Sequence, residues 1–370
     1  MGERRMTDVT VAPLLDRLDD YLEREGLEAV WFARPNSFAW LTGGGNNIVD
    51  RATDIGIAAV GYDGDERTVV TNNIEGQRLI DEEVGDVPVE TVEWYEDGVA
   101  DAIRAHSPRP AAADFDVEGF DTVEARDLRQ PLTADQIERY RSLAVDATRA
   151  FEGVLRDATA DATEREITAD IHRELEAEGI WAPVVLVGGS ERAPAYRHYT
   201  STETELGDYA LASITAMRDG LFVSTSRTIA FDAPEWLAER TDDAARVETT
   251  ALAATQRVGR EGGTAGDVFA AVQDAYAQLG WSGEWENHHQ GGAAGFAGRE
   301  WIATPTHDAP VFLPMAYSWN PTVQGAKSED THLVTDESVD PISVTGEWPR
   351  TTVSAVGADL TLDRHDVLHL

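Results

Sequence analysis

Residues 286–330 hold side chains whose types and spacing could carry chemistry. Two adjacent histidines, His288 and His289, lie in a glycine-rich stretch, and the pair Arg299 and Glu300 follows it. Glycine lets a backbone or a ligand approach closely, so glycines beside two imidazoles are typical of the wall of a site. The alternative is a glycine-rich turn with surface histidines. If the stretch is a strand, neighbouring side chains point to opposite faces, and we expect His289 to face inward.

Lys327 is the second feature of this stretch, because it is the only lysine in a chain with 30 lysines and arginines in total. It lies close to Glu329 and Asp330. An ammonium group is a compact charge with three donors, which suits a carboxylate or phosphate ligand. Glu329 is predicted either to orient a histidine or accept a substrate proton, or to be a buried partner of Lys327 or an arginine.

A third histidine, His198, lies between Arg197 and Tyr199. Imidazole titrates near neutral pH, so His198 is a candidate general acid and base. The alternative is a histidine at a strand end that bonds the backbone. An arginine side chain can donate two parallel hydrogen bonds to one carboxylate. The basic residues near the expected cleft therefore favour an anionic substrate group. The candidate substrate-binding residues are Arg197, Arg227, His288, Arg299, Glu300, Asn320 and Lys327.

The composition sets bounds on the kind of protein. The formal net charge is −38, with acidic residues spread along all 370 residues rather than in a tail. This pattern indicates a folded, carboxylate-covered protein from a high-salt cytoplasm, where screening weakens the repulsion. It argues against nucleic-acid partners and anionic membranes. There are no cysteines, so disulfides and thiolate metal sites are excluded. No signal-peptide core or membrane-length apolar run is present.

The pattern of elements predicts two domains. Alternating α and β signals over residues 1–131 indicate a small α/β domain, in which Pro35 breaks a strand and Trp40–Thr42 forms a strand end. A helix over 134–156 opens an α+β domain over residues 132–370. Further helices are predicted from Thr163 to Gly179, over 234–258, and from Thr264 to Gly280. Strands are predicted over 181–187, 209–215, 221–225, 286–303, 312–319 and 329–334.

These segments, taken in order, resemble the creatinase, prolidase and Xaa-Pro aminopeptidase family. The resemblance covers nearly the whole chain and implies a creatinase-like N-terminal domain and a pita-bread C-terminal domain. It also implies a homodimer. The matching segments are Trp31–Gly43 with the family's n-x-x-y-L-T-G, Arg197-His198-Tyr199 with its histidine-bearing strand, Ser224–Thr228 with D-I-T-R-T, His289 with G-H-G-x-G, Asn320-Pro321 with E-P-G, and Glu329-Asp330-Thr331 with E-D-t.

The departures from the family pattern concern the metal ligands. Active aminopeptidases of this fold hold two metal ions with two Asp, one His and two Glu. Here the second Asp position carries Ser224, the first Glu position carries Asn320, and the first Asp position is Ser213 or Thr215. Only His289 and Glu329 keep a ligand type. Hydroxyl and amide groups do not supply the charge that holds two divalent cations, so the sequence argues against a dinuclear centre.

The family comparison also bears on proton transfer. Arg299 stands where the family has a later proton-shuttling histidine. Creatinase uses the same fold without metal, and a histidine at the position of His198 is retained. Its two substrate-holding glutamates would fall near Ser226 and Asn320 and are absent. A guanidinium-binding role is therefore not expected.

The sequence predicts a hydrolase that cleaves a C–N bond in a small carboxylate-bearing molecule or short peptide. No cofactor is expected. His198 is the expected general acid and base, His289 and Glu329 position water or polarise the scissile group, and Lys327 and arginines anchor the carboxylate. One alternative is a metal-dependent Xaa-Pro aminopeptidase that uses His198, His289, Glu300 and Glu329 as ligands. The other is a catalytically silent binding protein of the same fold.

Overall fold

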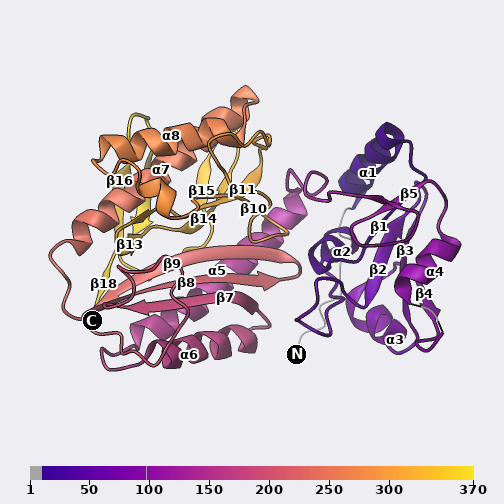
Figure 1. The fold of residues 1–370 in the computed structure, drawn as a ribbon, viewed down its shortest axis with the longest axis horizontal. Coiled ribbons are helices and arrows are strands. Elements are labelled where there is room, and N and C mark those ends of the chain that lie inside the picture. The colour runs from indigo at the N-terminus through magenta and orange to yellow at the C-terminus, as the bar shows by residue number, and fades with distance from the viewer. Residues whose placement is uncertain (1–10, 97) are drawn as a thin grey trace. The chain divides into compact units, whose positions relative to one another are not determined.

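The computed structural model describes residues 11–96 and 98–370. The chain forms two compact units (Figure 1). One covers the chain up to Asp135 together with Asp219–Leu221, and the other covers Gln136–Arg218 and Phe222–Leu370.

The first unit is built around a six-stranded mixed sheet in the order β4-β3-β2-β1-β5-β6. The central strand β1 pairs antiparallel with β2 and parallel with β5. Its apolar residues are buried on both faces, which is typical of a strand covered by helices. The elements are α1 (Ala12–Glu25), β1 (Ala29–Phe32), α2 (Pro35–Thr42), β2 (Ala58–Tyr62), β3 (Arg67–Asn72), α3 (Gly76–Arg78), the π-helix η1 (Leu79–Glu83), β4 (Val89–Val92), α4 (Val99–His106), β5 (Ala111–Ala113) and β6 (Asp121–Thr122).

The segment after β1 differs from the sequence prediction. Strand β1 ends before Pro35 as predicted, but Pro35 then begins helix α2, which continues to Thr42. Proline is favoured in the first turn of a helix because its missing N–H has no intrahelical partner at that position. Gly43, with φ of 81°, ends the helix in the left-handed conformation. The predicted strand end at Trp40–Thr42 is therefore wrong.

The second unit holds two four-stranded sheets with the orders β18-β9-β8-β7 and β10-β11-β14-β15. Figure 1 shows the sheets between two helix pairs, with α5 and α6 on one side and α7 and α8 on the other. The helices are α5 (Ala134–Arg156), α6 (Glu164–Ala177), α7 (Leu237–Glu261), α8 (Ala265–Gln278) and the 3-10 turn η2 (Glu284–Asn287). The sheet strands are β7 (Trp181–Gly189), β8 (Tyr209–Arg218), β9 (Leu221–Ala230), β10 (Gly291–Ala294), β11 (Met315–Trp319), β14 (Asp330–Val334), β15 (Val339–Pro341) and β18 (Leu368–His369). Two ribbons complete the unit, β12 (Thr322–Val323) with β13 (Ala326–Lys327), and β16 (Arg350–Ser354) with β17 (Thr361–His365).

Local sequence explains where two of these helices begin. Thr163 caps α6, where the predicted helix begins, and Glu166 bonds back to the Thr163 backbone, which forms a capping box. Thr264 and Asp267 form the same motif at the start of α8. Each motif satisfies backbone N–H groups that have no intrahelical partner. Local sequence thus marks these two starts, and distant backbone carbonyls, such as that of Thr204 for α6 and that of Ala309 for α8, accept from the first helical N–H groups.

The two sheets of the second unit are joined between β9 and the start of β14. The Ser226 N–H donates to the Glu329 carbonyl over 2.9 Å. The Thr331 hydroxyl accepts from the Ser224 N–H over 3.0 Å and donates to the Ser224 carbonyl over 2.9 Å. These bonds set alternate residues of β9 beside the Glu329–Thr331 segment.

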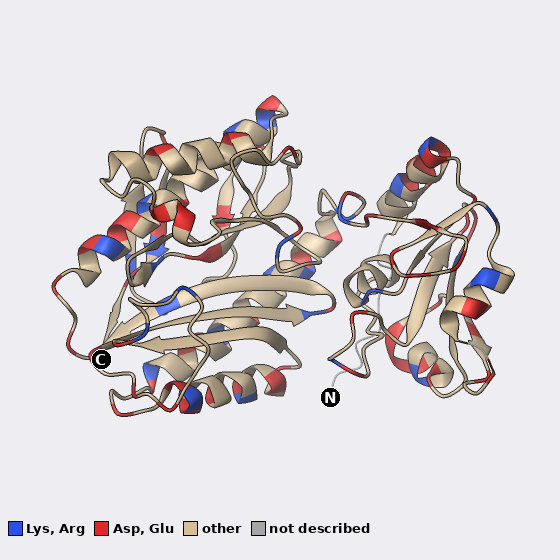
Figure 2. Ribbon diagram, viewed as in Figure 1, with Lys and Arg blue, Asp and Glu red and all other residues tan. Residues whose placement is uncertain are grey.

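Charge is distributed over both units. Figure 2 shows acidic residues on the helices and loops of each unit, whereas strands β7 to β9 carry few charged residues. Within the described part of the chain, no helix has the length and apolar character needed to cross a bilayer.

We expect the folded protein to gain stability with salt, because its net charge of −38 is a source of self-repulsion. Raising KCl from 0.1 M to 2 M shortens the screening length from about 10 Å to below about 3 Å. The midpoint of thermal unfolding should rise by at least about 5 °C, since 1 kcal/mol shifts it by roughly 2–4 °C in units of this size. An uncharged osmolyte at equal osmolality is the control. A midpoint that is flat or falls with KCl would contradict this account.

Candidate functional site

Four hydroxyl side chains line one face of the β8–β9 hairpin. Ser213 and Thr215 alternate along β8, and Ser224 and Ser226 alternate along β9. The Ser213 and Ser226 hydroxyls are 2.7 Å apart, and those of Thr215 and Ser224 are 2.9 Å apart. Alternate residues of a strand share a face, so the hairpin offers a continuous row of hydroxyls.

Glu329 lies against this row, between two cationic side chains. Its Oε2 is 2.7 Å from the Lys327 ammonium and also accepts from the Ser226 hydroxyl. Its Oε1 accepts from the Arg299 guanidinium over 2.8 Å. Lys327 further donates to Ser213 over 3.2 Å. We refer to Glu329, Lys327 and Arg299, with the four hydroxyls, as the cation centre.

The cation centre is buried, which fixes its charge state. Glu329 is 3% exposed and Lys327 is 7% exposed. Burial alone would raise the pKa of Glu329, but the charges of Lys327 and Arg299 lower it to about 2. The carboxylate is therefore ionised at neutral pH, and both of its oxygens are occupied. This is the alternative in which Glu329 is a buried partner of Lys327 and an arginine.

The three candidate histidines lie together in a second group, the histidine cluster. His288 Nε2 is 3.2 Å from His198 Nε2. The rings of His288 and His289 stack with centroids 4.3 Å apart, and the ring of His289 is 5.9 Å from that of His198. Burial, reinforced by the charge of Lys327, lowers the pKa of His288 to about 2. Burial and the charge of Arg299 lower the pKa of His289 to about 4, so both rings are neutral at pH 7.

An ion pair ties the two histidine segments to each other. Arg197, next to His198, donates to Glu284 over 2.7 Å, and Glu284 begins the η2 turn that leads into His288. One terminal nitrogen of Arg197 is used in this contact, and its predicted role in binding a substrate carboxylate stays a prediction. The far end of the His198 loop is held by Arg192, which pairs with the buried Glu164 at the start of α6. The pairing of Arg197 with Glu284 was missed in the sequence, because nothing local links residues so far apart along the chain.

The structure corrects the expected orientation of the adjacent histidines. Residues 286–290 are not a strand, because η2 ends at Asn287 and β10 begins only at Gly291. The rings of His288 and His289 stack, and His288, at 8% exposure, is the more buried of the two, so the expectation that His289 is the one that faces inward is wrong. Gly291 has φ of 95°, which breaks the strand geometry that the prediction assumed.

Arg227 is placed in a separate, fully buried charge network. It is 1% exposed, and it pairs with Glu152 over 2.8 Å and with Asp330 over 2.9 Å. Asp330 also pairs with Arg364 over 3.1 Å, and Arg364 pairs with Glu248 over 2.6 Å. A guanidinium with these partners has no access to a substrate, so we assign Arg227 a structural role in place of the predicted substrate contact. Sequence reasoning missed Glu152, Glu248 and Arg364 in this network, because no local pattern links these residues to Arg227.

Glu300 and Asn320 are both buried on the β10 side of the unit. Glu300 accepts from the Phe296 N–H over 2.9 Å and so closes the turn after β10. Asn320 follows β11, and its backbone N–H donates to the Gln290 carbonyl over 3.0 Å. Its side-chain oxygen is buried with no hydrogen-bond partner in the described part of the chain.

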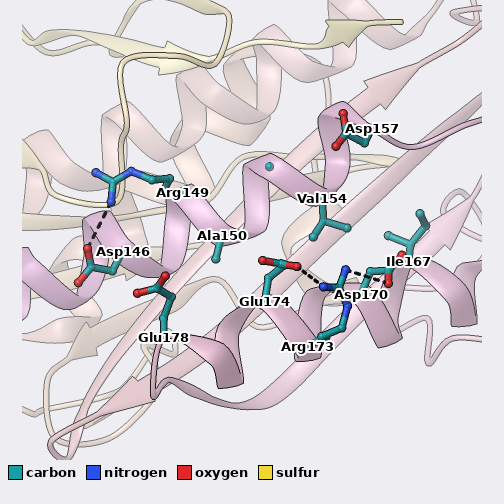
Figure 3. A pocket seen from close by; sticks show the side chains of 11 residues that line it. Asp146, Arg149, Ala150, Val154, Asp157, Ile167, Asp170, Arg173, Glu174 and Glu178 are labelled. Carbon is teal, nitrogen blue, oxygen red and sulfur yellow. Dashed lines mark hydrogen bonds and ion pairs between the residues drawn. The ribbon is translucent and has the colours of Figure 1, made fainter. Parts of the chain in front are cut away.

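The groove between α5 and α6 offers a contrast with the cation centre (Figure 3). It has a volume of about 460 Å³, and five acidic residues and two arginines are among its lining. Arg149 is paired with Asp146, and Arg173 with Asp170 and Glu174. Because acids outnumber arginines and both arginines are already paired, an anionic molecule is not attracted there. The five acidic residues and two arginines of the lining are Asp146, Arg149, Asp157, Asp170, Arg173, Glu174 and Glu178.

Residues 136–336 match the model of metallopeptidase family M24. The chain belongs to this family. No curated protein matches the sequence. The fold agrees with this family. The protein has the creatinase-like N-terminal domain and the pita-bread C-terminal domain that occur in prolidases and Xaa-Pro dipeptidases.

Three solved structures show this fold. The prolidase from Pyrococcus horikoshii OT3 is 17% identical, with a TM-score of 0.72 over 90% of this chain and 98% of that one. The Xaa-Pro dipeptidase from Bacillus anthracis is 15% identical, with a TM-score of 0.72 over 98% and 100% of the two chains. The N-terminal domain of a FACT complex subunit from chickpea is 12% identical, with a TM-score of 0.61 over 91% and 97%. The same fold thus occurs in peptidases and in a subunit of a larger complex.

The residues present do not fit the two-metal centre of M24 aminopeptidases. The resemblance places the two aspartates at Ser213 or Thr215 and at Ser224, and in the structure these positions carry hydroxyls that are hydrogen-bonded to other hydroxyls. The one remaining glutamate, Glu329, is neutralised by an ammonium and a guanidinium. A divalent cation at Glu329 would be repelled by Lys327 and Arg299 and would meet no second carboxylate. The alternative ligand set of His198, His289, Glu300 and Glu329 is not assembled either.

Glu329→Gln should destabilise the second unit by about 3–5 kcal/mol at neutral pH, because it leaves two buried cations without their carboxylate. The pKa of Glu329 is depressed in the folded state, so its contribution is complete above the unfolded value near 4.5 and is lost as the pH falls towards 2. Urea unfolding of both proteins at pH 7 and pH 3 measures the difference, which should shrink at pH 3.

The double variant Lys327→Met/Glu329→Gln is the control for this prediction. It removes one cation with the carboxylate, so its cost should be smaller than the sum of the costs of the two single variants. Equal stability of Glu329→Gln and the unmodified protein at pH 7 would contradict the ion-pair account.

Proposed function

We propose that this M24 chain binds a small molecule or short peptide through a carboxylate and hydrolyses a C–N bond in it without the family's two-metal centre. The observation that carries the proposal is the charge of the cation centre. Lys327 and Arg299 supply two positive charges against the single negative charge of Glu329. A net positive centre at low exposure, in a protein with net charge −38, favours an anionic ligand.

Hydrogen-bonding capacity in the cation centre supports a carboxylate in particular. The Lys327 ammonium has three protons, of which the described contacts with Glu329 and Ser213 use two. The hydroxyls of Ser213 and Ser226 can rotate to donate to an incoming oxygen. Hydrogen bonds between charged partners are stronger than neutral ones, so a carboxylate gains more here than an amide.

The histidine cluster supplies the proton transfer in this proposal. His198 is exposed, and its Nε2 contacts His288, so its ring can take a proton from an attacking water. The water oxygen bonds to the carbonyl carbon, the C–N bond breaks, and His198 returns the proton to the departing amine nitrogen. The Xaa-Pro dipeptidase named among the similar structures supports dipeptides, which carry a free carboxylate, as the first substrates to test.

Binding without turnover is the second candidate function, and the saturation of Glu329 favours it. Both oxygens of Glu329 accept bonds from other side chains, so it does not act as a base without breaking an ion pair. The FACT complex subunit among the similar structures supports a role of this fold outside peptide hydrolysis. Ligand-induced stabilisation with no product from any stabilising compound would favour this candidate.

A carboxylate ligand should bind at least about 10-fold more tightly than its amide, because a hydrogen bond to a charged group contributes about 1.5–3 kcal/mol. A thermal-shift screen of dipeptides and N-acyl amino acids finds the ligand, and calorimetry then compares it with the matching C-terminal amide. Equal affinity for acid and amide would overturn the carboxylate assignment. Lys327→Met should weaken the acid alone, and Arg257→Gln, which removes one exposed charge from α7, is the matched control.

His198→Gln should abolish hydrolysis of a substrate found in this way and leave its dissociation constant within about 3-fold, because glutamine keeps the polarity but does not titrate. Product release is followed by chromatography, and binding by calorimetry. Unchanged turnover in His198→Gln would exclude His198 as the group that transfers the proton. His172→Gln on the exposed face of α6 controls for the loss of a histidine.

A further inference from the structure

The histidine cluster has a geometry that proton transfer does not require. One ring nitrogen from each of His198, His288 and His289 lies within 4.8 Å of the other two. Two of these nitrogens, the Nε2 atoms of His198 and His288, are 3.2 Å apart. A tetrahedral site with metal–nitrogen distances of about 2.0–2.1 Å separates its ligand nitrogens by about 3.3–3.4 Å. The His198–His288 pair is thus already close to the spacing of two ligands of one ion.

We propose that His198, His288 and His289 form a site for a single transition-metal ion such as Zn²⁺, Co²⁺, Ni²⁺ or Cu²⁺. This site differs from the two-metal centre of the family in donor type and in stoichiometry, and His289 is its one residue at a position where the resemblance implies a family ligand. It does not depend on the proposed hydrolysis, because a binding protein could hold the same ion. A ring nitrogen that binds a metal does not accept a proton, so metal binding and proton transfer are alternative states of His198.

The donor set determines which ions fit. Imidazole nitrogen suits zinc, copper, nickel and cobalt, whereas magnesium and manganese prefer carboxylate and carbonyl oxygen. The group contains three histidines and no carboxylate. Three protein ligands leave a fourth position open, and His198 lies at the exposed edge of the cluster.

Contacts around the cluster hold the three rings in place without a bound ion. The Arg197–Glu284 ion pair joins the His198 loop to the turn before His288. Gln290, which follows His289, donates to the His288 carbonyl over 2.6 Å, and its own oxygen accepts from the Tyr276 hydroxyl over 2.9 Å. A site whose ligands are positioned in advance loses less conformational freedom on binding.

Titration of the metal-free protein with metal ions tests the proposal directly. Tag-free protein is treated with a chelator, freed of it by dialysis, and titrated by calorimetry with Zn²⁺, Co²⁺, Mn²⁺ and Mg²⁺ in turn. We expect one equivalent of Zn²⁺ or Co²⁺ to bind, with visible Co²⁺ absorption typical of nitrogen ligands, and no binding of Mn²⁺ or Mg²⁺. Absence of Zn²⁺ binding, or binding of two equivalents of Mn²⁺ as expected for a carboxylate centre, would overturn the proposal.

Single substitutions test which side chains bind the ion. His198→Gln and His289→Gln should each weaken Zn²⁺ binding by more than about 100-fold, because loss of a residue that merely supports a ligand already costs 10–100-fold. Glu284→Gln should weaken it by about 10-fold through loss of the Arg197 contact. His172→Gln is the control and should bind like the unmodified protein. If the His198 and His289 variants, folded by circular dichroism, keep the original affinity, the ion lies elsewhere and the assignment fails.

Discussion

The buried carboxylate of Glu329 is the group on which the arrangement of the second unit depends. Its backbone carbonyl joins β9 to the start of β14, and its side chain joins β13, the turn after β10 and the β8–β9 hairpin through Lys327, Arg299 and Ser226. An ion pair at this depth must recover the cost of removing three charges from water, so its geometry has to be complete. Each of these segments is therefore fixed relative to one carboxylate, which gives the centre its rigidity.

A second set of buried charges lies next in sequence and supports the first. Asp330 faces away from Glu329, as neighbours on a strand do, and pairs with Arg227 and Arg364. Arg227 comes from β9 and Arg364 from β17, so this network connects strands that share no backbone hydrogen bonds. The Glu329 carboxylate therefore organises the candidate site, and the Asp330 carboxylate organises the buried layer next to it.

Sequence patterns predicted the elements better than the contacts between them. The helix over 134–156 and the starts of α6 and α8 were readable because periodicity and capping boxes are local signals. Helix α2 was missed because a proline begins a helix as readily as it ends a strand. The stacked histidines were misjudged because a strand was assumed over 286–290. The pairing of Arg197 with Glu284 and the position of Arg227 depend on burial and long-range packing, which one sequence does not reveal.

The exchange of ligand types changes the sign of the charge at the site. A two-metal centre needs carboxylates to balance four positive charges, and such a centre in this fold has two aspartates and two glutamates. This chain keeps one of those four carboxylates, has hydroxyls or an amide at the other positions, and adds its only lysine and Arg299. The ammonium and the guanidinium then take the place of the ions as partners of Glu329, and one positive charge is left over. In the proposed function, a site that would bind cations through carboxylates therefore binds an anion through cations, while the fold around it stays that of the family.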